Sequence, residues 1–256
     1  MEKEKDLLLL QKRIRELARR AEQTGCPQFT DFLNLYEQNI LHDTLRNFPQ
    51  VTWRTFGGYD QAERQMAAFL PDAFSYEETK PEYPIACLHI RPKNSRFAET
   101  LSHRDILGAL MNLGIDRCKT GDIPVLQEEA YLFCHESLGE MICRELTRIR
   151  RTSVVCSLCR EADFTYTPRT ETVTGSISSL WLDALLSVAF QSSRSSLLSL
   201  IQEGKVFVNG RLITSNAFIP KEGDLVSVRG LGRFRYLGAG GQTKKGRRIV
   251  QAERFI

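Results

Sequence analysis

The stretch KVFVNGRLI, residues 205–213, decides how the last third of this 256-residue chain folds. Asn209-Gly210 lies between two β-prone runs, and this pair is the strongest short signal for a hairpin because both turn residues need positive φ. Amphipathic patterns before it predict two short helices, over 180–189 and 194–203. The stretch therefore predicts a small module of two helices and an antiparallel sheet.

Positive charge is concentrated in the same part of the chain. Residues 171–256 hold 12 lysine and arginine residues against six acidic ones, whereas the preceding residues are slightly acidic. Between residues 225 and 252 there is no acid, and seven cations are present: Arg229, Arg233, Arg235, Lys244, Lys245, Arg247 and Arg248. Two of these arginines alternate with Phe234 and Tyr236, which predicts a strand anchored on one side and cationic on the other. A polyanion would be attracted to this end, although charge alone is equally compatible with a solvated tail.

Residues 1–80 are predicted to form a mainly helical N-terminal domain. Helices are expected over 7–21, 32–41 and 61–70, and a short strand is expected over 53–56. Prolines in the charged stretch that follows indicate a domain boundary near residue 80.

Residues 81–165 are predicted to form an RRM-like middle domain. Ser102, with Asp105 three residues later, is typical of a helix start. The expected elements are strands over 85–90, 121–125, 130–134 and 152–158 and helices over 102–113 and 140–149. This βαββαβ order is the split βαβ arrangement of ferredoxin-like and RRM folds, and it does not fix a function.

The polar segment over 161–175 reads as a linker or an irregular strand, which places the third domain at 176–256. The expected fold class is therefore α+β, with three domains. The longest apolar run, over 7–10, is far too short to span a bilayer, and no signal-peptide pattern is seen, so a cytoplasmic protein is expected. In that compartment the seven cysteines are most simply free thiols.

The C-terminal module resembles the S4 RNA-binding domain. The matching positions are Leu182-Asp183, Arg194, Leu200-Ile201, Gly204-Lys205-Val206, Val208-Asn209-Gly210 and Gly223-Asp224. The resemblance implies an αL-type surface of two helices and a hairpin that binds structured RNA, including rRNA and tRNA. Proteins recognise A-form RNA by its shape, through phosphates and 2′-hydroxyls, and arginine can bind phosphate bidentately. S4 domains commonly carry arginine just before Leu-Asp, where this chain has Trp181.

This surface supplies the RNA-binding candidates. Arg194 opens a helix of the matching motif, and Lys205 and Arg211 flank the hairpin, whereas Trp181 would either stack on a ribose or base or pack against the fold. The last four cations lie in a glycine-rich segment and are expected to act as a flexible, phosphate-neutralising arm. The full set is Trp181, Arg194, Lys205, Asn209, Arg211, Arg233, Arg235, Lys244, Lys245, Arg247 and Arg248.

Motifs in the first half of the chain are similar to those of YlmH-type S4 proteins. They are Gly57-Gly58-Tyr59, Ala62-Glu63-Arg64, the run 102–108, Leu113-Gly114-Ile115 and Gly121-Asp122-Ile123. The similarity implies a bacterial, cytoplasmic protein, often encoded near cell-division genes. It also implies association with the large ribosomal subunit and a part in the rescue of stalled, tRNA-obstructed subunits.

The middle domain offers a candidate second RNA surface around its first helix. Its members are Arg96, His103, Arg104, Arg117 and Lys119. The alternative is ordinary surface charge on a structural domain. Tyr131 and Phe133 share one face of a strand, where they would either stack on bases or belong to the core, and the core is favoured.

No catalytic, metal or cofactor site is expected. Cys156 and Cys159 form a CxxC pair, but a structural zinc site needs four ligands and the sequence has no second pair. The run His103-Arg104-Asp105 resembles a kinase catalytic loop that lacks its asparagine. We therefore predict a non-enzymatic RNA-binding protein that is a monomer off the ribosome. The alternatives are an RNA-modifying enzyme with an unrecognised active site in residues 1–170 and a cell-division interaction adaptor.

Overall fold

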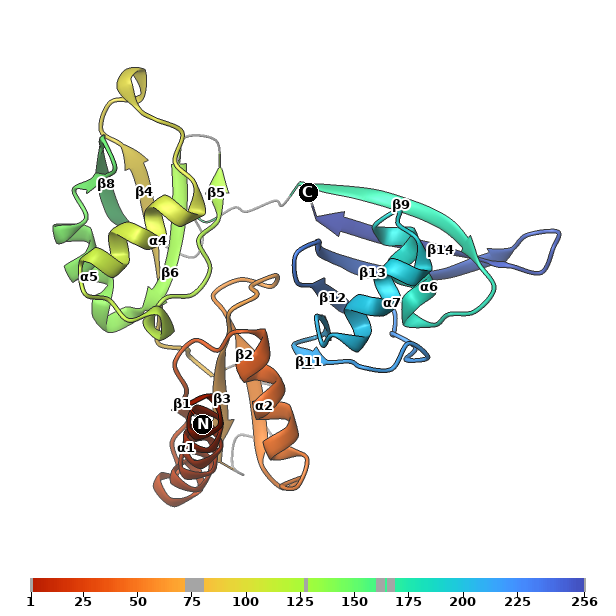
Figure 1. Ribbon diagram of the computed structural model, residues 1–256. Coiled ribbons are helices and arrows are strands. Elements are labelled where there is room, and N and C mark those ends of the chain that lie inside the picture. Colours follow the sequence, from red (N-terminus) through yellow and green to blue (C-terminus); the bar gives the residue numbers. More distant parts are fainter. Residues whose placement is uncertain (1, 72–80, 127–128, 160–163, 165–168, 256) are drawn as a thin grey trace. The chain divides into compact units, whose positions relative to one another are not determined.

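The computed structural model describes residues 2–71, 81–126, 129–159, 164 and 169–255 (Figure 1). The chain divides into two compact units, residues 1–166 and 167–256. The first unit contains the N-terminal and middle domains, and the second contains the S4-like module. Among the described residues, no helix has both the length and the apolar character needed to cross a membrane.

The N-terminal region is helical, as predicted, and a three-stranded antiparallel sheet accompanies the helices. Its elements are α1 (Glu2–Thr24), β1 (Gln28–Phe29), α2 (Leu35–Leu45), β2 (Thr52–Phe56) and β3 (Met66–Leu70), with the sheet order β1-β3-β2. The helix expected over 61–70 is wrong, because β3 occupies that segment. All five residues of β3 are buried, and a short apolar run of this kind has no period that separates strand from helix.

Asn34 fixes the start of α2. Its side-chain oxygen accepts the N–H groups of Tyr36 and Glu37, and the Glu37 carboxylate accepts the N–H of Asn34 at 2.7 Å. The apolar sides of α1 and α2 form one core with β3, in which Leu41 and Phe69 are fully buried. The N-terminal domain therefore has a hydrophobic core of its own.

The middle domain has the predicted βαββαβ order. Its elements are β4 (Ile85–Pro92), the 3-10 helix η1 (Ser95–Phe97), α4 (His103–Asn112), the 3-10 helix η2 (Arg117–Lys119), β5 (Val125–Leu126), β6 (Glu129–His135), α5 (Glu136–Glu145), β7 (Arg148–Ile149) and β8 (Thr152–Cys159). The sheet order β5-β6-β4-β8-β7 is that of a split βαβ fold. The capping box of Ser102 and Asp105 starts α4 as predicted, whereas α5 begins earlier than the expected residue 140.

The two faces of the middle sheet have different neighbours. Helices α4 and α5 cover one face (Figure 1), where Leu88 and Leu132 of the sheet and Ile142 of α5 are fully buried. Side chains alternate along a strand, so Tyr131 and Phe133 of β6 lie on the opposite face. That second face is the one on which the N-terminal domain makes contact.

The second unit places two helices on one face of a six-stranded antiparallel sheet (Figure 1). Its elements are β9 (Thr170–Ile177), α6 (Leu182–Ala189), α7 (Arg194–Gln202), β10 (Val206–Val208), β11 (Arg211–Leu212), β12 (Leu225–Val228), β13 (Gly232–Gln242) and β14 (Arg248–Phe255), with the sheet order β11-β10-β12-β13-β14-β9. The predicted hairpin is confirmed, because Val208 pairs with Arg211 and both Asn209 and Gly210 have positive φ.

The segment predicted as a linker or irregular strand over 161–175 contributes an edge strand of this sheet. β9 pairs with β14 along its whole length, from Thr170 opposite Phe255 to Ile177 opposite Arg248. Val173 is buried while the threonines beside it are at the surface, which is the two-residue period of a half-buried strand. The sheet of the C-terminal module therefore begins before residue 176, and this boundary is corrected to the start of β9.

Candidate RNA-binding surfaces

An arginine–aspartate pair joins the two helices of the second unit. Arg194, the first residue of α7, donates two hydrogen bonds to the Asp183 carboxylate near the start of α6, at 3.1 Å from Nε and 2.6 Å from Nη2. The side chain of Asp183 is 8% exposed and that of Arg194 is 46% exposed. Arg194 therefore holds the helices together and still offers almost half of its surface to a ligand such as phosphate.

Asn209 locks the hairpin to the turn that precedes β12. Its Nδ2 donates to the Asp224 carboxylate at 2.8 Å, and its Oδ1 accepts the N–H of Leu225 at 2.9 Å. The other oxygen of Asp224 accepts the N–H of Lys221 at 2.7 Å. Both the donor and the acceptor of the Asn209 side-chain amide are thus used in hydrogen bonds within the fold. This RNA-binding candidate therefore stabilises the hairpin.

Side-chain alternation puts part of the predicted cationic set on the outer face of the sheet, away from the helices. Phe234 and Tyr236 of β13 are buried in the helix-covered core, so Arg233 and Arg235 lie on the opposite face. The guanidinium carbon of Arg233 lies 4.9 Å from the ring centroid of Phe255, a cation–π contact. A second such contact, at 5.1 Å, places Arg229 over Phe207.

Other candidates lie on the helix side or beside the hairpin. Arg211 is exposed and sits opposite Val208, whose side chain belongs to the helix-covered core, so Arg211 shares the side of Arg194. Lys205 forms an ion pair with Glu203 at 2.6 Å and remains 44% exposed. The predicted set is therefore divided between two faces, and it does not form one continuous surface.

The glycine-rich basic segment is an ordered hairpin, so the expected flexible arm is wrong. β13 and β14 extend to Gln242 and from Arg248, and the tip between them closes with a hydrogen bond of 2.8 Å from the Thr243 N–H to the Arg247 carbonyl. The Arg247 guanidinium also donates to the carbonyl of Ser176. Lys244 and Lys245 are exposed in the turn at this tip.

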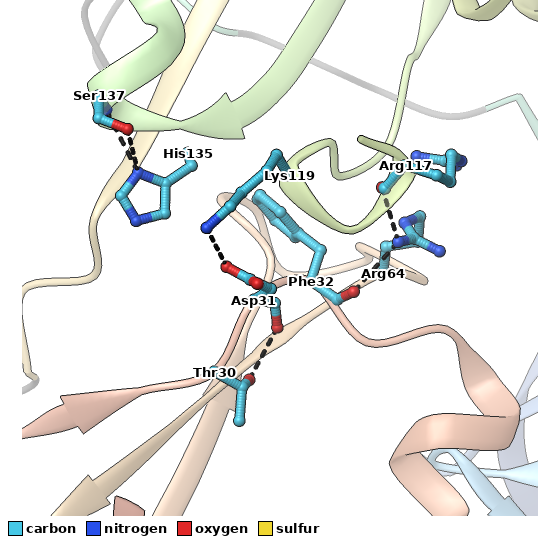
Figure 2. A network of polar contacts seen from close by, with 8 residues as sticks. All are labelled: Thr30, Asp31, Phe32, Arg64, Arg117, Lys119, His135 and Ser137. Carbon is cyan, nitrogen blue, oxygen red and sulfur yellow. Dashed lines mark hydrogen bonds and ion pairs between the residues drawn. The ribbon is translucent and has the colours of Figure 1, made fainter. Parts of the chain in front are cut away.

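In the first unit, Arg64 connects the N-terminal domain to the middle domain (Figure 2). Its Nε donates to the carbonyl of Thr120 at 2.9 Å, and its Nη2 donates to those of Phe32 at 3.1 Å and Arg117 at 3.0 Å. The residue is 9% exposed, and burial lowers the pKa of its guanidinium. We use the name latch for the contacts that Arg64 and Asp122 make between the two domains.

Asp122 completes the latch from the middle domain. Its carboxylate accepts the Tyr59 hydroxyl at 2.8 Å and the backbone N–H groups of Glu63 at 2.7 Å and Arg64 at 3.0 Å. A Cβ on Gly58, which has a φ of 96°, would lie 2.3 Å from the ring of Phe133. The sequence motifs at 57–64 and 121–123 therefore bind each other, a role that sequence reasoning did not find.

Comparison with known proteins follows the same division of the chain. Family models match at residues 11–72 ("YlmH, N-terminal"), 79–163 ("Putative RNA-binding domain in YlmH") and 180–226 ("S4 domain"). A Bacillus subtilis protein named "Ribosome-associated protein quality control protein P2" is 31% identical over 231 residues, which are 89% of this chain and 87% of that protein. The chain belongs to the YlmH family of S4-domain RNA-binding proteins. A solved structure of "Cell division protein ylmH from Streptococcus pneumoniae" is 23% identical and covers 63% of this chain and 94% of its own, with a TM-score of 0.49.

Two cations of the candidate second surface, Arg117 and Lys119, lie where the N-terminal and middle domains of this YlmH-family protein meet. Lys119 pairs with Asp31 at 2.6 Å (Figure 2), and Arg117 donates from Nη1 to the carbonyls of Thr120 at 2.9 Å and Gly121 at 3.2 Å. Burial and then the charge of Arg64 lower the pKa of Arg117 to about 10. Lys119 thus joins the middle domain to the N-terminal domain, whereas the Arg117 side chain bonds within the middle domain, and both uses leave less of the surface for RNA.

The other members of that surface lie at and before the start of α4. His103 and Arg104 lie at the surface in its first turn, where partial desolvation of the His103 ring and then the charge of Arg117 lower the pKa of His103. His103 is therefore mainly neutral near pH 7. Arg96 is exposed in η1. The positive charges of Arg117 and Arg104 thus both act on His103.

The aromatic pair on β6 is divided between core and surface. Phe133 is 2% exposed and stacks on Tyr59 with ring centroids 5.1 Å apart, so the core prediction is confirmed for it. Tyr131 is half-buried and stacks on His89 with centroids 4.8 Å apart and an interplanar angle of 9°. The N-terminal domain therefore covers the part of the middle sheet at Phe133.

The cysteines show no ligand constellation in the part of the chain that the structure describes. No group of three or more His, Cys, Asp or Glu side chains converges there as metal ligands would. Burial raises the pKa of Cys156, and the Cys143 sulfur lies 3.5 Å from it across the middle-domain core. Protonated, buried thiols of this kind act as small apolar side chains.

Proposed function

We propose that this protein binds structured RNA, both rRNA and tRNA, through its S4 unit on the large ribosomal subunit. The observation that carries the proposal is the Arg194–Asp183 pair, which presents an exposed guanidinium from two rigidly joined helices. Arg211 lies on the same side of the fold, and residues 171–256 hold twice as many cations as acids. Preorganised arginines bind phosphates at a lower entropic cost than mobile ones.

The relative in Bacillus subtilis supports the cellular setting of the proposal. Its name assigns it to ribosome-associated protein quality control, and the match covers most of both chains. We infer that this chain acts in the rescue of stalled, tRNA-obstructed large subunits in the cytoplasm. In this proposal the protein acts by binding, without catalysis, and is a monomer off the ribosome.

The middle domain is proposed as a second, weaker RNA contact. His103, Arg104 and Arg117 belong to this candidate surface, and a phosphate bound beside His103 would stabilise its charged form. Binding at this surface should therefore strengthen as the pH falls toward 6. An affinity that does not change with pH would remove His103 from the contact.

Crosslinking in cells, followed by sequencing of the bound RNA, tests the main proposal. Reads from large-subunit rRNA and from tRNA are expected, and they should fall in a variant carrying Arg194→Ala and Arg211→Ala. Arg13→Ala, an exposed arginine on α1, is the matched control and should leave the reads unchanged. Recovery of no RNA, or of mRNA alone, would overturn the proposal.

A further inference from the structure

Trp181 exposes a large aromatic ring that the fold does not use. It occupies the N-cap of α6, where its carbonyl accepts the N–H groups of Ala184 at 3.0 Å and Leu185 at 3.1 Å, and its side chain makes no capping bond. The residue is 43% exposed, and among the described residues of the second unit no other aromatic residue is as exposed. The backbone alone starts the helix, so helix formation does not explain an indole at this position.

A second exposed apolar side chain belongs to a loop that is bonded to the start of α6. The N–H of Leu182 donates to the carbonyl of Phe218 at 2.8 Å, which brings the loop at 218–219 against the start of α6. Phe218 packs on the core of the unit, whereas Ile219 is 56% exposed. The backbone bond therefore places two exposed apolar residues, Trp181 and Ile219, on neighbouring segments, and we call this pair the Trp181–Ile219 ledge.

The ledge and the Arg194–Asp183 pair both lie at the N-terminal end of α6. Trp181 is the N-cap, and Asp183, two residues later, accepts the guanidinium of Arg194. A ligand that fits here combines a flat apolar group with a negative charge. A nucleotide has both, because its base can stack on an aromatic ring while its phosphate pairs with arginine.

We propose that the Trp181–Ile219 ledge binds one unpaired base of the RNA, with Arg194 on an adjoining phosphate. The inference rests on the proposed RNA-binding function and adds the kind of RNA that is preferred. A continuous duplex offers no free base face, because its bases stack on one another. The protein should therefore prefer RNA with a bulge or an open loop to a fully paired stem.

The chain offers a direct optical test, because its only tryptophans are Trp53 and Trp181. In the full-length Trp53→Phe variant, all tryptophan emission comes from Trp181. This protein is titrated at low salt with an RNA stem that carries one bulged adenosine, and with the same stem without the bulge. Fluorescence anisotropy of end-labelled RNA reports binding separately from the tryptophan signal.

Binding of the bulged stem should quench Trp181, and binding of the paired stem should not. Trp181→Ala should weaken the bulged complex about tenfold and leave the paired complex unchanged, whereas Trp181→Phe should keep most of the preference. Leu237→Ala removes a matched exposed apolar side chain on β13 and should change neither affinity. Thermal melts of each variant report whether it is folded.

The two proposals fail in different ways. Binding of both stems with equal affinity and without quenching would overturn the ledge while leaving the S4 unit an RNA-binding module. Equal losses for both stems in Trp181→Ala would do the same. Binding of neither stem, nor of tRNA or rRNA, would overturn the proposed function and the ledge with it.

Discussion

Two arginines of this protein, Arg64 and Arg194, both belong to sequence motifs, yet they do different work. Arg64 is 9% exposed, and its donors are used by three backbone carbonyls from two domains. The side chain of Arg194 is 46% exposed and is held by one nearly buried carboxylate. The first arrangement uses the cation to join two domains, whereas the second leaves a cation accessible, which in the proposed function contacts RNA. The two roles differ in how much of each side chain remains exposed once its hydrogen bonds are made. Residue type and membership of a motif do not distinguish them.

Arg64→Ala should have the largest effect and should act on stability alone. It leaves three carbonyls at the domain joint without their donor, which costs about 3 kcal/mol of unfolding free energy in the first unit. Urea unfolding followed by Trp53 emission in a Trp181→Phe background measures it, because Trp53 lies in that unit. Arg13→Ala, on the exposed side of α1, should change stability by less than about 0.5 kcal/mol.

The same variant also tests the separation of roles. The folded Arg64→Ala protein should bind tRNA with unchanged affinity at temperatures well below its unfolding transition. A large loss of affinity with little change in unfolding would show that Arg64 faces RNA. The comparison between the two arginines would then be wrong.

Arg194→Ala should reverse the pattern and weaken RNA binding by about 1–3 kcal/mol, because a charged contact to phosphate is lost. It also leaves the Asp183 carboxylate nearly buried without its partner, so stability falls as well. The double variant Asp183→Asn with Arg194→Ala separates the two effects, since it removes the buried charge. Anisotropy titrations with tRNA should show the same loss of affinity in both variants. Recovery of affinity in the double variant would assign the loss to folding.

Asn209→Ala replaces a residue of the S4 unit that, like Arg64, we expect to act on stability alone. Its amide bonds Asp224 and Leu225, and the residue has a φ of 48°, so replacement should lower the stability of the second unit by about 1–2 kcal/mol. The affinity of the folded protein for RNA should stay within twofold. Trp181 emission in a Trp53→Phe background reports the unfolding. A tenfold weaker affinity with unchanged stability would return Asn209 to the RNA-binding surface.

Where local chemistry decides the structure, the sequence predicted it well. The Asn209-Gly210 turn, the capping box at Ser102 and the βαββαβ order all follow from short-range rules, and all are present. β3 was missed because a buried five-residue run has no helical or strand period. Residues 161–175 could be read as a linker or as a strand, because the pairing of β9 with β14 joins residues far apart in the chain.

The candidate site was predictable in its residue types and less so in its geometry. Arg194 was found from the S4 motif and Arg211 from its place beside the predicted hairpin, and the structure leaves both accessible. The roles of Arg64 and Asp122 were not found, because most of their partners are backbone atoms in the other domain, which no local pattern specifies. The division of the cations between the two faces of the sheet could not be predicted either, because it depends on the register of the strands.

The double variant Lys244→Ala with Lys245→Ala should have the smallest effect. It tests whether cations at the edge of the S4 unit contact phosphate as Arg194 is proposed to do. Both lysines are exposed at the tip of the β13–β14 hairpin. If each neutralises one phosphate, the slope of log affinity against log salt should fall by about 1 for each lysine, with a modest loss of affinity at physiological salt. Anisotropy titrations at several salt concentrations give the slope, and Lys12→Ala on α1 should leave it unchanged. A slope unaltered by the double replacement would place the tip outside the RNA contact and restrict the surface to the helices and the body of the sheet.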